Sequence, residues 1–225
     1  MSERIDLNGA LEQLRTALKA PESGQQNNPQ RILFALTGVP GSGKSTLAAA
    51  LINHLTEQER QQIICLPMDG FHLSKQQLQL LSNPEEAMQR RGAPWTFDSQ
   101  SFIRRTKQLK QSYQKNTVHW PSFEHTVGDP IENDIHIDKE IKVILIEGLY
   151  LLHTADGWQE SKDLFDCHWF LDIPLEIANQ RLTQRHITAW EMTQQEAQER
   201  INKSDGLNAK LVHSYRHQAD YLLKV

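Results

Sequence analysis

The sequence predicts an α/β protein built on a doubly wound parallel sheet. Apolar runs, typical of parallel strands that are covered on both faces, span residues 31–37, 63–67, 142–148 and 167–173 and alternate with helical patterns. The first run leads directly into a glycine-rich turn and then into a helix. Because such sheets bind ligands beyond the carboxyl ends of their strands, we expect the functional residues there.

A helix and a linker are predicted ahead of the main domain. Leucines at helical spacing in residues 6–19 indicate the helix, and the polar, turn-forming segment 21–30 follows it. We therefore expect residues 1–30 to form an appendage and residues 31–225 to form the main domain.

Capping residues predict where several later helices begin. Asn83 precedes a proline and two glutamates, Asp98 opens a long polar helix, and Thr193 begins a capping box. A short strand is expected at residues 118–120, followed by an exposed loop, and a last strand is expected within residues 219–225.

Composition argues against two classes of partner. Lys and Arg total 24 and Asp and Glu total 28, so the net charge of -4 disfavours a general nucleic-acid binder and a polybasic membrane-surface protein. No apolar run approaches the roughly 18 residues of a membrane span. Cys65 and Cys167 each lie in an apolar stretch without a neighbouring cysteine, so we expect buried free thiols in a reducing cytoplasm.

Residues 38–45 read GVPGSGKS and match the GxxxxGK[ST] pattern between a predicted strand and a predicted helix. Glycines let backbone N–H groups curl around phosphate oxygens, and the helix start adds roughly half a positive charge. Lys44 is expected to reach the β- and γ-phosphates of ATP, and Ser45 to hold Mg²⁺. The residues expected to bind the nucleotide are Gly38, Gly41, Ser42, Gly43, Lys44, Ser45 and Thr46.

Two carboxylates follow neighbouring strands of the predicted sheet. Asp69 lies just past the second strand and Glu147 ends the third, so both should emerge at the edge that carries the glycine-rich turn. Phosphoryl transfer needs a base for the acceptor hydroxyl and a metal ion, and these two side chains can divide that work. The alternatives are a turn residue before Gly70 for Asp69 and a surface carboxylate for Glu147.

A nucleotide switch is an alternative to a kinase. Residues 202–205 read NKSD and match the NKxD pattern by which GTPases read guanine. That pattern normally ends a buried strand, whereas here it follows a polar helical stretch, and no DxxG element ends a predicted strand. The context of these motifs favours a kinase.

Five segments occur in an order that a known family shares. They are GVPGSGKS at 38–45, MDGFH at 68–72, RRGAPWTFD at 90–98, PSFEH at 121–125 and IEGLYLL at 146–152. With them the chain, from about residue 31 to its C-terminus, resembles the uridine kinase, phosphoribulokinase and bacterial pantothenate kinase family. It looks most similar to the pantothenate-kinase-like and fructose-transport-associated sugar kinase branch. The resemblance implies a P-loop-containing nucleoside triphosphate hydrolase fold with a helical lid at about residues 175–205.

The resemblance also implies roles for single residues. Asp69 corresponds to the catalytic base, and Glu147 to a carboxylate of the metal shell or of the acceptor site. The family brings arginines to the phosphates on its lid, and Arg181 and Arg185, four residues apart on one helix face, fit that place. Two solvated helix arginines are the alternative.

By the same resemblance, the acceptor site lies in the segments after the second strand and before the third. The candidates are His72, Arg90, Trp95, Phe97, His125 and Glu147, and the same segments contain Arg91 and Phe123. Trp95 and Phe97 are equally consistent with core residues, and His125 with a surface histidine. The tyrosine-rich pattern of uridine kinases and the long insertion of phosphoribulokinase are absent, so the acceptor stays open.

The sequence thus predicts a cytoplasmic kinase that uses ATP and Mg²⁺ to phosphorylate a hydroxyl of a small pantothenate-, sugar- or nucleoside-like metabolite. The alternative is a nucleotide-binding regulatory protein with only slow ATP hydrolysis. We expect no nucleic-acid or membrane partner, and the resemblance suggests a homodimer.

Overall fold

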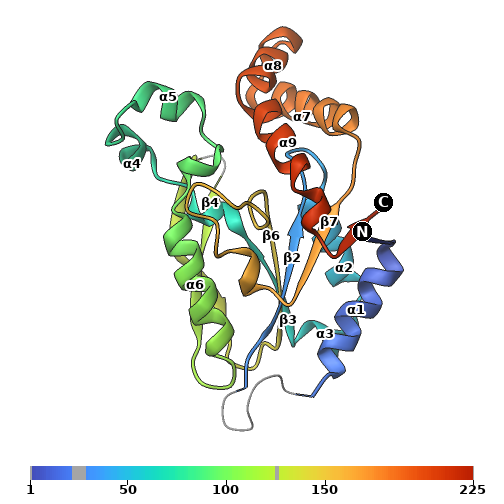
Figure 1. Ribbon diagram of the computed structural model, residues 1–225. Helices are drawn as coiled ribbons and strands as arrows, with labels where there is room; N and C mark the ends of the chain where they lie inside the picture. Colours follow the sequence, from blue (N-terminus) through green and yellow to red (C-terminus); the bar gives the residue numbers. More distant parts are fainter. Residues whose placement is uncertain (1, 22–28, 125–126, 225) are drawn as a thin grey trace.

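The computed structural model describes residues 2–21, 29–124 and 127–224. Within this part of the chain a six-stranded parallel sheet forms the centre, with helices on both faces (Figure 1). Its strands, in spatial order, are β1 (Glu3–Ile5), β8 (Tyr221–Leu223), β7 (Cys167–Leu171), β2 (Ile32–Thr37), β6 (Val143–Gly148) and β3 (Ile63–Pro67). The predicted parallel α/β sheet is confirmed.

The central strands are apolar throughout because both of their faces are buried. In β2, Leu33 and Ala35 belong to one core cluster, whereas Phe34 and Leu36 belong to the other. Successive side chains of a strand point to opposite faces, so this alternation places one apolar cluster on each side of the sheet.

Each face has its own cover (Figure 1). Helices α1 (Leu7–Lys19) and α2 (Lys44–Asn53) pack on one face, and the short helix α3 (Glu57–Arg60) follows α2. The other face carries α6 (Ser99–Gln111) and an antiparallel hairpin of β4 (Val118–Glu124) and β5 (Asp129–Ile137). The sheet is thus wound on both sides, as predicted.

Two groups of helices lie beyond the carboxyl edge of the sheet (Figure 1). One group, which we call the arm, contains α4 (Lys75–Gln79) and α5 (Pro84–Gln89) and follows a 3₁₀ turn, η1 (Met68–Phe71). The second group comprises α7 (Leu175–Trp190), α8 (Gln194–Arg200), a π-helix η4 (Ile201–Asp205) and α9 (Gly206–Ser214). Single 3₁₀ turns at η2 (Pro94–Thr96), η3 (Lys162–Leu164) and η5 (Arg216–Gln218) complete the described elements.

The predicted helix starts are confirmed by their caps. The side chain of Asn83 accepts a hydrogen bond from the backbone N–H of Glu86, and that of Asp98 accepts one from Ser101. Thr193 forms the reciprocal capping box with the side chain three residues later. Each cap accepts a hydrogen bond from an N–H group that has no partner within the helix. Because this interaction involves only neighbouring residues, a single capping residue was enough to predict where each helix begins.

The prediction that the N-terminal helix is an appendage is wrong. Leu14 of α1 is fully buried and shares a core cluster with Phe34 of β2. The three residues of β1, which sequence patterning did not reveal, pair with β8 at the edge of the sheet. Most of the predicted linker, residues 22–28, lies outside the described part of the chain.

A hairpin lies where a short strand and an exposed loop were predicted. Sequence patterning indicated a strand at 118–120 and an exposed loop after it, but β4 continues to Glu124 and β5 pairs with it over Asp129–Ile137. Five of the nine side chains of β5 are exposed, and four of those five are polar. Residues 131–134 are exposed in succession, so both faces of the strand are solvated there and its composition resembles that of a loop.

The two cysteines and the lengths of the helices test two predictions that were drawn from composition. Cys65 and Cys167 are free thiols, half-buried rather than fully buried, and burial raises the pKa of each to about 12. At neutral pH both are therefore protonated and unreactive. Within the described residues, no helix combines the length and apolarity needed to cross a membrane.

Replacing Leu14 by alanine tests whether α1 belongs to the core. Since Leu14 is 0% exposed, we expect Leu14→Ala to lower the free energy of unfolding by about 2–5 kcal/mol, through lost burial and a residual cavity. Leu80 is 81% exposed, so the matched control Leu80→Ala should change that free energy by less than about 0.5 kcal/mol. Urea unfolding followed by circular dichroism measures both. Equal effects would show that α1 adds nothing to the core.

Candidate active site

The glycine-rich turn lies between β2 and α2, where it was predicted. Gly41 has a φ of +75°, and a Cβ atom there would lie 2.4 Å from the carbonyl oxygen of Ala178 in α7. A side chain is therefore excluded both by the backbone conformation and by the neighbouring helix. Gly43, also in the left-handed region, directly precedes α2. The N–H groups in the first turn of α2 have no partner within the helix and can bind an anion.

The side chains of Lys44 and Ser42 are suited to bind phosphate oxygens. The Lys44 ammonium donates to the backbone carbonyls of Gly38 at 3.0 Å and Val39 at 3.3 Å. Burial lowers its pKa, whereas the carboxylates of Glu147 and Asp69 act in the opposite direction. The hydroxyl of Ser42 is buried, with no hydrogen-bond partner among the described residues. Phosphate oxygens would satisfy both groups.

Glu147 occupies the end of β6, between the two strands that carry the other site residues. It pairs with Leu36 of β2 on one side and with Pro67 of β3 on the other. Ser45 Oγ donates a 2.6 Å hydrogen bond to Glu147 Oε1. Burial raises the pKa of Glu147, and the Ser45 hydrogen bond and the Lys44 charge oppose this. A carboxylate and a hydroxyl oxygen so close together are ligands that Mg²⁺ prefers.

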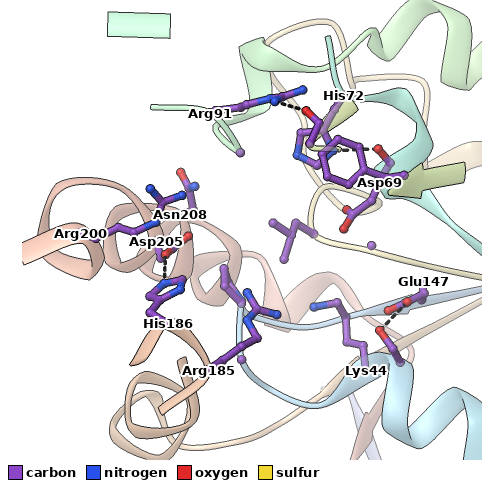
Figure 2. A pocket seen from close by; sticks show the side chains of 18 residues that line it. Lys44, Asp69, His72, Arg91, Glu147, Arg185, His186, Arg200, Asp205 and Asn208 are labelled. Atoms are coloured by element: carbon purple, nitrogen blue, oxygen red, sulfur yellow. Dashed lines mark hydrogen bonds and ion pairs between the residues drawn. The ribbon is translucent and has the colours of Figure 1, made fainter. Parts of the chain in front are cut away.

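Asp69 lies in the η1 turn directly after β3. Its position depends on close packing between Met68 and Gly148, because a Cβ atom on Gly148 would lie 2.5 Å from Met68 Cβ. The glycine after Glu147 thus lets the two strand ends approach each other. As a result Asp69 faces the same space as Lys44 and Glu147 (Figure 2).

That space is a cavity of about 290 Å³ between the sheet edge, the arm and the helices α7 to α9. The predicted site residues that line it are Gly41, Lys44, Ser45, Asp69, His72, Glu147 and Arg185. A second cavity, of about 340 Å³, lies on the outer side of the turn. It is lined by Gly41, Gly43, Lys44, Ser45, Thr46, Arg181 and Arg185 among others. The two cavities share the start of α2.

The two predicted arginines of α7 face the glycine-rich turn, residues 38–45, which we call the phosphate loop. Arg181 Nη1 donates to the carbonyl of Ser42 at 3.0 Å, which ties α7 to the loop. Arg185 lines both cavities and contributes to the lowered pKa of Lys44 by charge repulsion. Their spacing of four residues places both on the loop side of the helix, which is what phosphate contacts require.

The predicted acceptor residues are only partly brought together. The His72 ring lines the cavity and lies between Phe97, at 3.9 Å between centroids, and Phe123, at 4.5 Å. Phe97 is buried in the core behind His72, whereas Phe123 lines the cavity. The rings of His72 and Phe123 therefore face the cavity, and Phe97 supports them from the core.

Three further candidates lie elsewhere. Arg90 lines neither cavity, and its Nη2 donates to Asn208 Oδ1 at 3.4 Å. Trp95 is 38% exposed and lies outside both cavities. His125 falls outside the described residues.

The far wall of the cavity is formed on α7 to α9 by His186, Arg200, Asp205 and Asn208 (Figure 2). Sequence reasoning did not single out the first three, whereas the family resemblance implies a polar residue near the adenine of ATP at the position of Asn208. His186 Nε2 lies 2.8 Å from Asp205 Oδ2. The only signal was the NKSD segment, whose aspartate is Asp205. That segment forms the π-helix and does not follow a strand, so it is not placed as the guanine-reading motif of a GTPase.

Comparison with known proteins tests the predicted family. The model of the phosphoribulokinase / uridine kinase family matches residues 33–224. A Schizosaccharomyces pombe protein named "putative uridine kinase" is 36% identical over 197 residues, which are 87% of this chain and 83% of that protein. An "ATP-dependent kinase-like protein" of Aspergillus versicolor is 39% identical over 145 residues, which are 63% of this chain and 84% of that protein.

A solved structure of a similar protein supports the same family assignment. The crystal structure of a "putative fructose transport system kinase" from Silicibacter sp. TM1040 is 31% identical, with a TM-score of 0.79, and the match covers 94% of this chain and 97% of that one. The predicted family and its P-loop fold are confirmed. The chain belongs to the phosphoribulokinase / uridine kinase family of ATP-dependent kinases.

Proposed function

We propose that the protein transfers the γ-phosphoryl group of ATP to a hydroxyl of a small pantothenate-, sugar- or nucleoside-like metabolite, with Mg²⁺ as the metal. One observation carries the proposal: Lys44, Glu147 and Asp69 line one cavity at the carboxyl edge of three adjacent strands. Lys44 and Glu147 suit the phosphate chain and its metal, and Asp69 adds a carboxylate beside them. A protein that only binds ATP does not need that third group.

The reaction is a direct in-line transfer. The acceptor oxygen attacks the γ-phosphorus while Asp69 accepts the hydroxyl proton, and the bond from that phosphorus to the β-phosphate oxygen breaks, releasing ADP. Lys44, Arg181 and Arg185 neutralise the charge on the phosphate oxygens. The helices α7 to α9 act as the lid, which excludes water from the cavity.

Ser45 and Glu147 are the residues that would hold Mg²⁺, since their oxygens lie 2.6 Å apart. When bound, the ion neutralises charge on the β- and γ-phosphate oxygens. Glu147 binds it only as a carboxylate. Because the pKa of Glu147 is raised by burial, proton and metal compete at this side chain over a higher pH range than at an ordinary glutamate.

The proposed function is tested by incubating the protein with γ-labelled ATP, Mg²⁺ and a panel of pantothenate, sugars and nucleosides. The expected result is label transfer that depends on one class of acceptor. A flat panel, with label released only as inorganic phosphate at an unchanged background rate, would favour the nucleotide-binding regulatory protein instead.

Asp69→Asn keeps the size of the side chain and removes the base. We expect kcat for transfer to fall by about 10²- to 10⁴-fold, the usual contribution of a general base, while the Kd for ATP changes little. Asp163 is exposed on η3, so Asp163→Asn is the matched control and should behave like the parent. Transfer by Asp69→Asn at nearly the parent rate would show that Asp69 is not the base.

Glu147 makes the metal requirement depend on pH. Its pKa lies above the ordinary value of 4.5, so as pH falls the side chain is protonated earlier and loses its affinity for Mg²⁺. We expect the Mg²⁺ concentration for half-maximal activity to rise as pH falls from about 8 toward about 5. Glu147→Gln should raise that concentration at all pH values and flatten its pH dependence. A parent-like profile in this variant would remove Glu147 from the metal site.

Arg185→Gln tests the role of the lid arginines. Since an arginine that stabilises the transferred group is worth about 10³-fold or more in turnover, we expect a loss of that order in kcat. Arg104 lies exposed on α6, so Arg104→Gln removes the same charge from the protein without touching either cavity. Steady-state kinetics compare the two variants. A similar small effect in both would mean that Arg185 is a solvated helix residue.

A further inference from the structure

The turn that carries Asp69 is held from behind by strand β4. Trp120 of β4 is 0% exposed and lines neither cavity. Its Nε1 donates a 2.8 Å hydrogen bond to the carbonyl oxygen of Pro67, the last residue of β3. Asp69 follows Pro67 by two residues. The inference drawn from this contact rests on the proposed function, because it concerns how Asp69 is placed for that reaction.

The hydrogen bond acts on the one free backbone rotation at the exit of β3. Pro67 has a φ of −82° and a ψ of 139°, and its ring restricts φ, so ψ is the angle that remains free. Rotation about ψ turns the carbonyl of Pro67 together with the peptide that leads into η1. Two residues reach about 7 Å, so a rotation of about 10° would move Asp69 by about 1 Å. A donor that holds the carbonyl therefore fixes where Asp69 lies.

The carbonyl of Pro67 depends on a side chain for its partner. Among the described strands, β3 is the last of the sheet, so its outward-facing groups must be satisfied from outside the sheet. The indole of Trp120 is itself fixed, because the rings of Phe71 and Phe102 pack against it at 4.8 and 5.8 Å between centroids. The donor thus has a defined position in the core.

Two further contacts join β4 to the same turn. A Cβ atom on Gly70 would overlap the backbone carbonyl of Pro121, so the absence of a side chain lets η1 lie directly against β4. On the cavity side, the ring of His72 packs on Phe123 at 4.5 Å between centroids. The contacts of β4 therefore lie before and after Asp69 along the chain.

We propose that Trp120 is a positioning residue for phosphoryl transfer. Through the carbonyl of Pro67 it holds Asp69 where the carboxylate accepts the proton of the acceptor hydroxyl. A general base acts only within hydrogen-bond reach of that proton, so a small displacement of Asp69 slows the reaction. Because Trp120 lines neither cavity, loss of its donor leaves the binding of ATP intact.

Trp120→Phe removes the N–H donor and keeps an aromatic ring in the core. We expect kcat for transfer to fall by roughly 10- to 100-fold, the loss that a displacement of about 1 Å causes, with the KM for ATP nearly unchanged. Steady-state kinetics with the acceptor found in the panel measure both constants. A kcat near the parent value would overturn the inference and leave the proposed function intact.

Trp158→Phe is the matched control. Trp158 is also 0% exposed, belongs to the same core cluster, and donates from Nε1 to the carbonyl of Pro94 at 3.2 Å. Pro94 lies in η2, which lines neither cavity. Both variants lose one hydrogen bond and similar packing, so their urea midpoints should fall by similar amounts. Only Trp120→Phe should lose turnover. Equal losses of kcat in the two variants would assign Trp120 to stability alone.

A double-mutant cycle with Asp69→Asn separates positioning from general damage. Without the carboxylate there is no base to place, so adding Trp120→Phe to Asp69→Asn should change the residual kcat little. The same fold loss in both backgrounds would show that Trp120 does not act through Asp69, and would overturn the inference. If the parent shows no acceptor-dependent transfer, the proposed function fails and the inference fails with it.

Gly70→Ala tests the same turn without altering Trp120, and it decides the matter if Trp120→Phe does not fold. The added methyl group displaces η1 from Pro121, so kcat should fall roughly 10-fold or more in the parent and little in the Asp69→Asn background. A parent-like kcat would show that the placement of this turn by β4 does not limit transfer, which contradicts the role given to Trp120.

Discussion

The 2.6 Å hydrogen bond from Ser45 Oγ to Glu147 Oε1 is the contact on which the rest of the site depends. It joins the first turn of α2 to the end of β6, and the register that pairs Glu147 with both Leu36 and Pro67 fixes where it forms. Parallel strands end at one edge of a sheet, so the phosphate loop after β2 and the η1 turn after β3 flank Glu147. The residues proposed to bind the phosphates, to hold the metal and to act as the base therefore come from the ends of three adjacent strands.

The electrostatics of the cavity follow from its burial. Burial lowers the pKa of Lys44 and raises that of Glu147, so each charge is costly until it finds a partner. Lys44 donates hydrogen bonds to backbone carbonyls of its own loop, and Glu147 accepts a hydrogen bond from the Ser45 hydroxyl. A metal-bound triphosphate offers better partners to both. In the proposed mechanism Arg185 adds positive charge at the phosphate end, and Asp205 and Asn208 line the opposite side of the cavity.

The sequence predicts the site residues that belong to a contiguous motif or stand at the end of an apolar strand. Lys44 and Ser45 are marked by a contiguous motif, and Asp69 and Glu147 stand at the ends of apolar strands, so periodicity alone places them at one edge. Arg200 and Asp205 escape such reasoning because a π-helix shifts the helical phase between them. Burial was not predicted from the sequence either. Leu14 packs into the core although the sequence pattern separates its helix from the main domain, and β5 resembles a loop because residues 131–134 are exposed in succession.

The central claim is that one cavity holds both the triphosphate tail and the acceptor hydroxyl. A crystal structure of the protein with Mg²⁺ and a non-hydrolysable ATP analogue tests it most directly. We expect the γ-phosphate to lie between the Lys44 ammonium and the Asp69 carboxylate, with the metal against Ser45 and Glu147. A γ-phosphate turned away from Asp69, into the outer cavity beside Thr46, would contradict it.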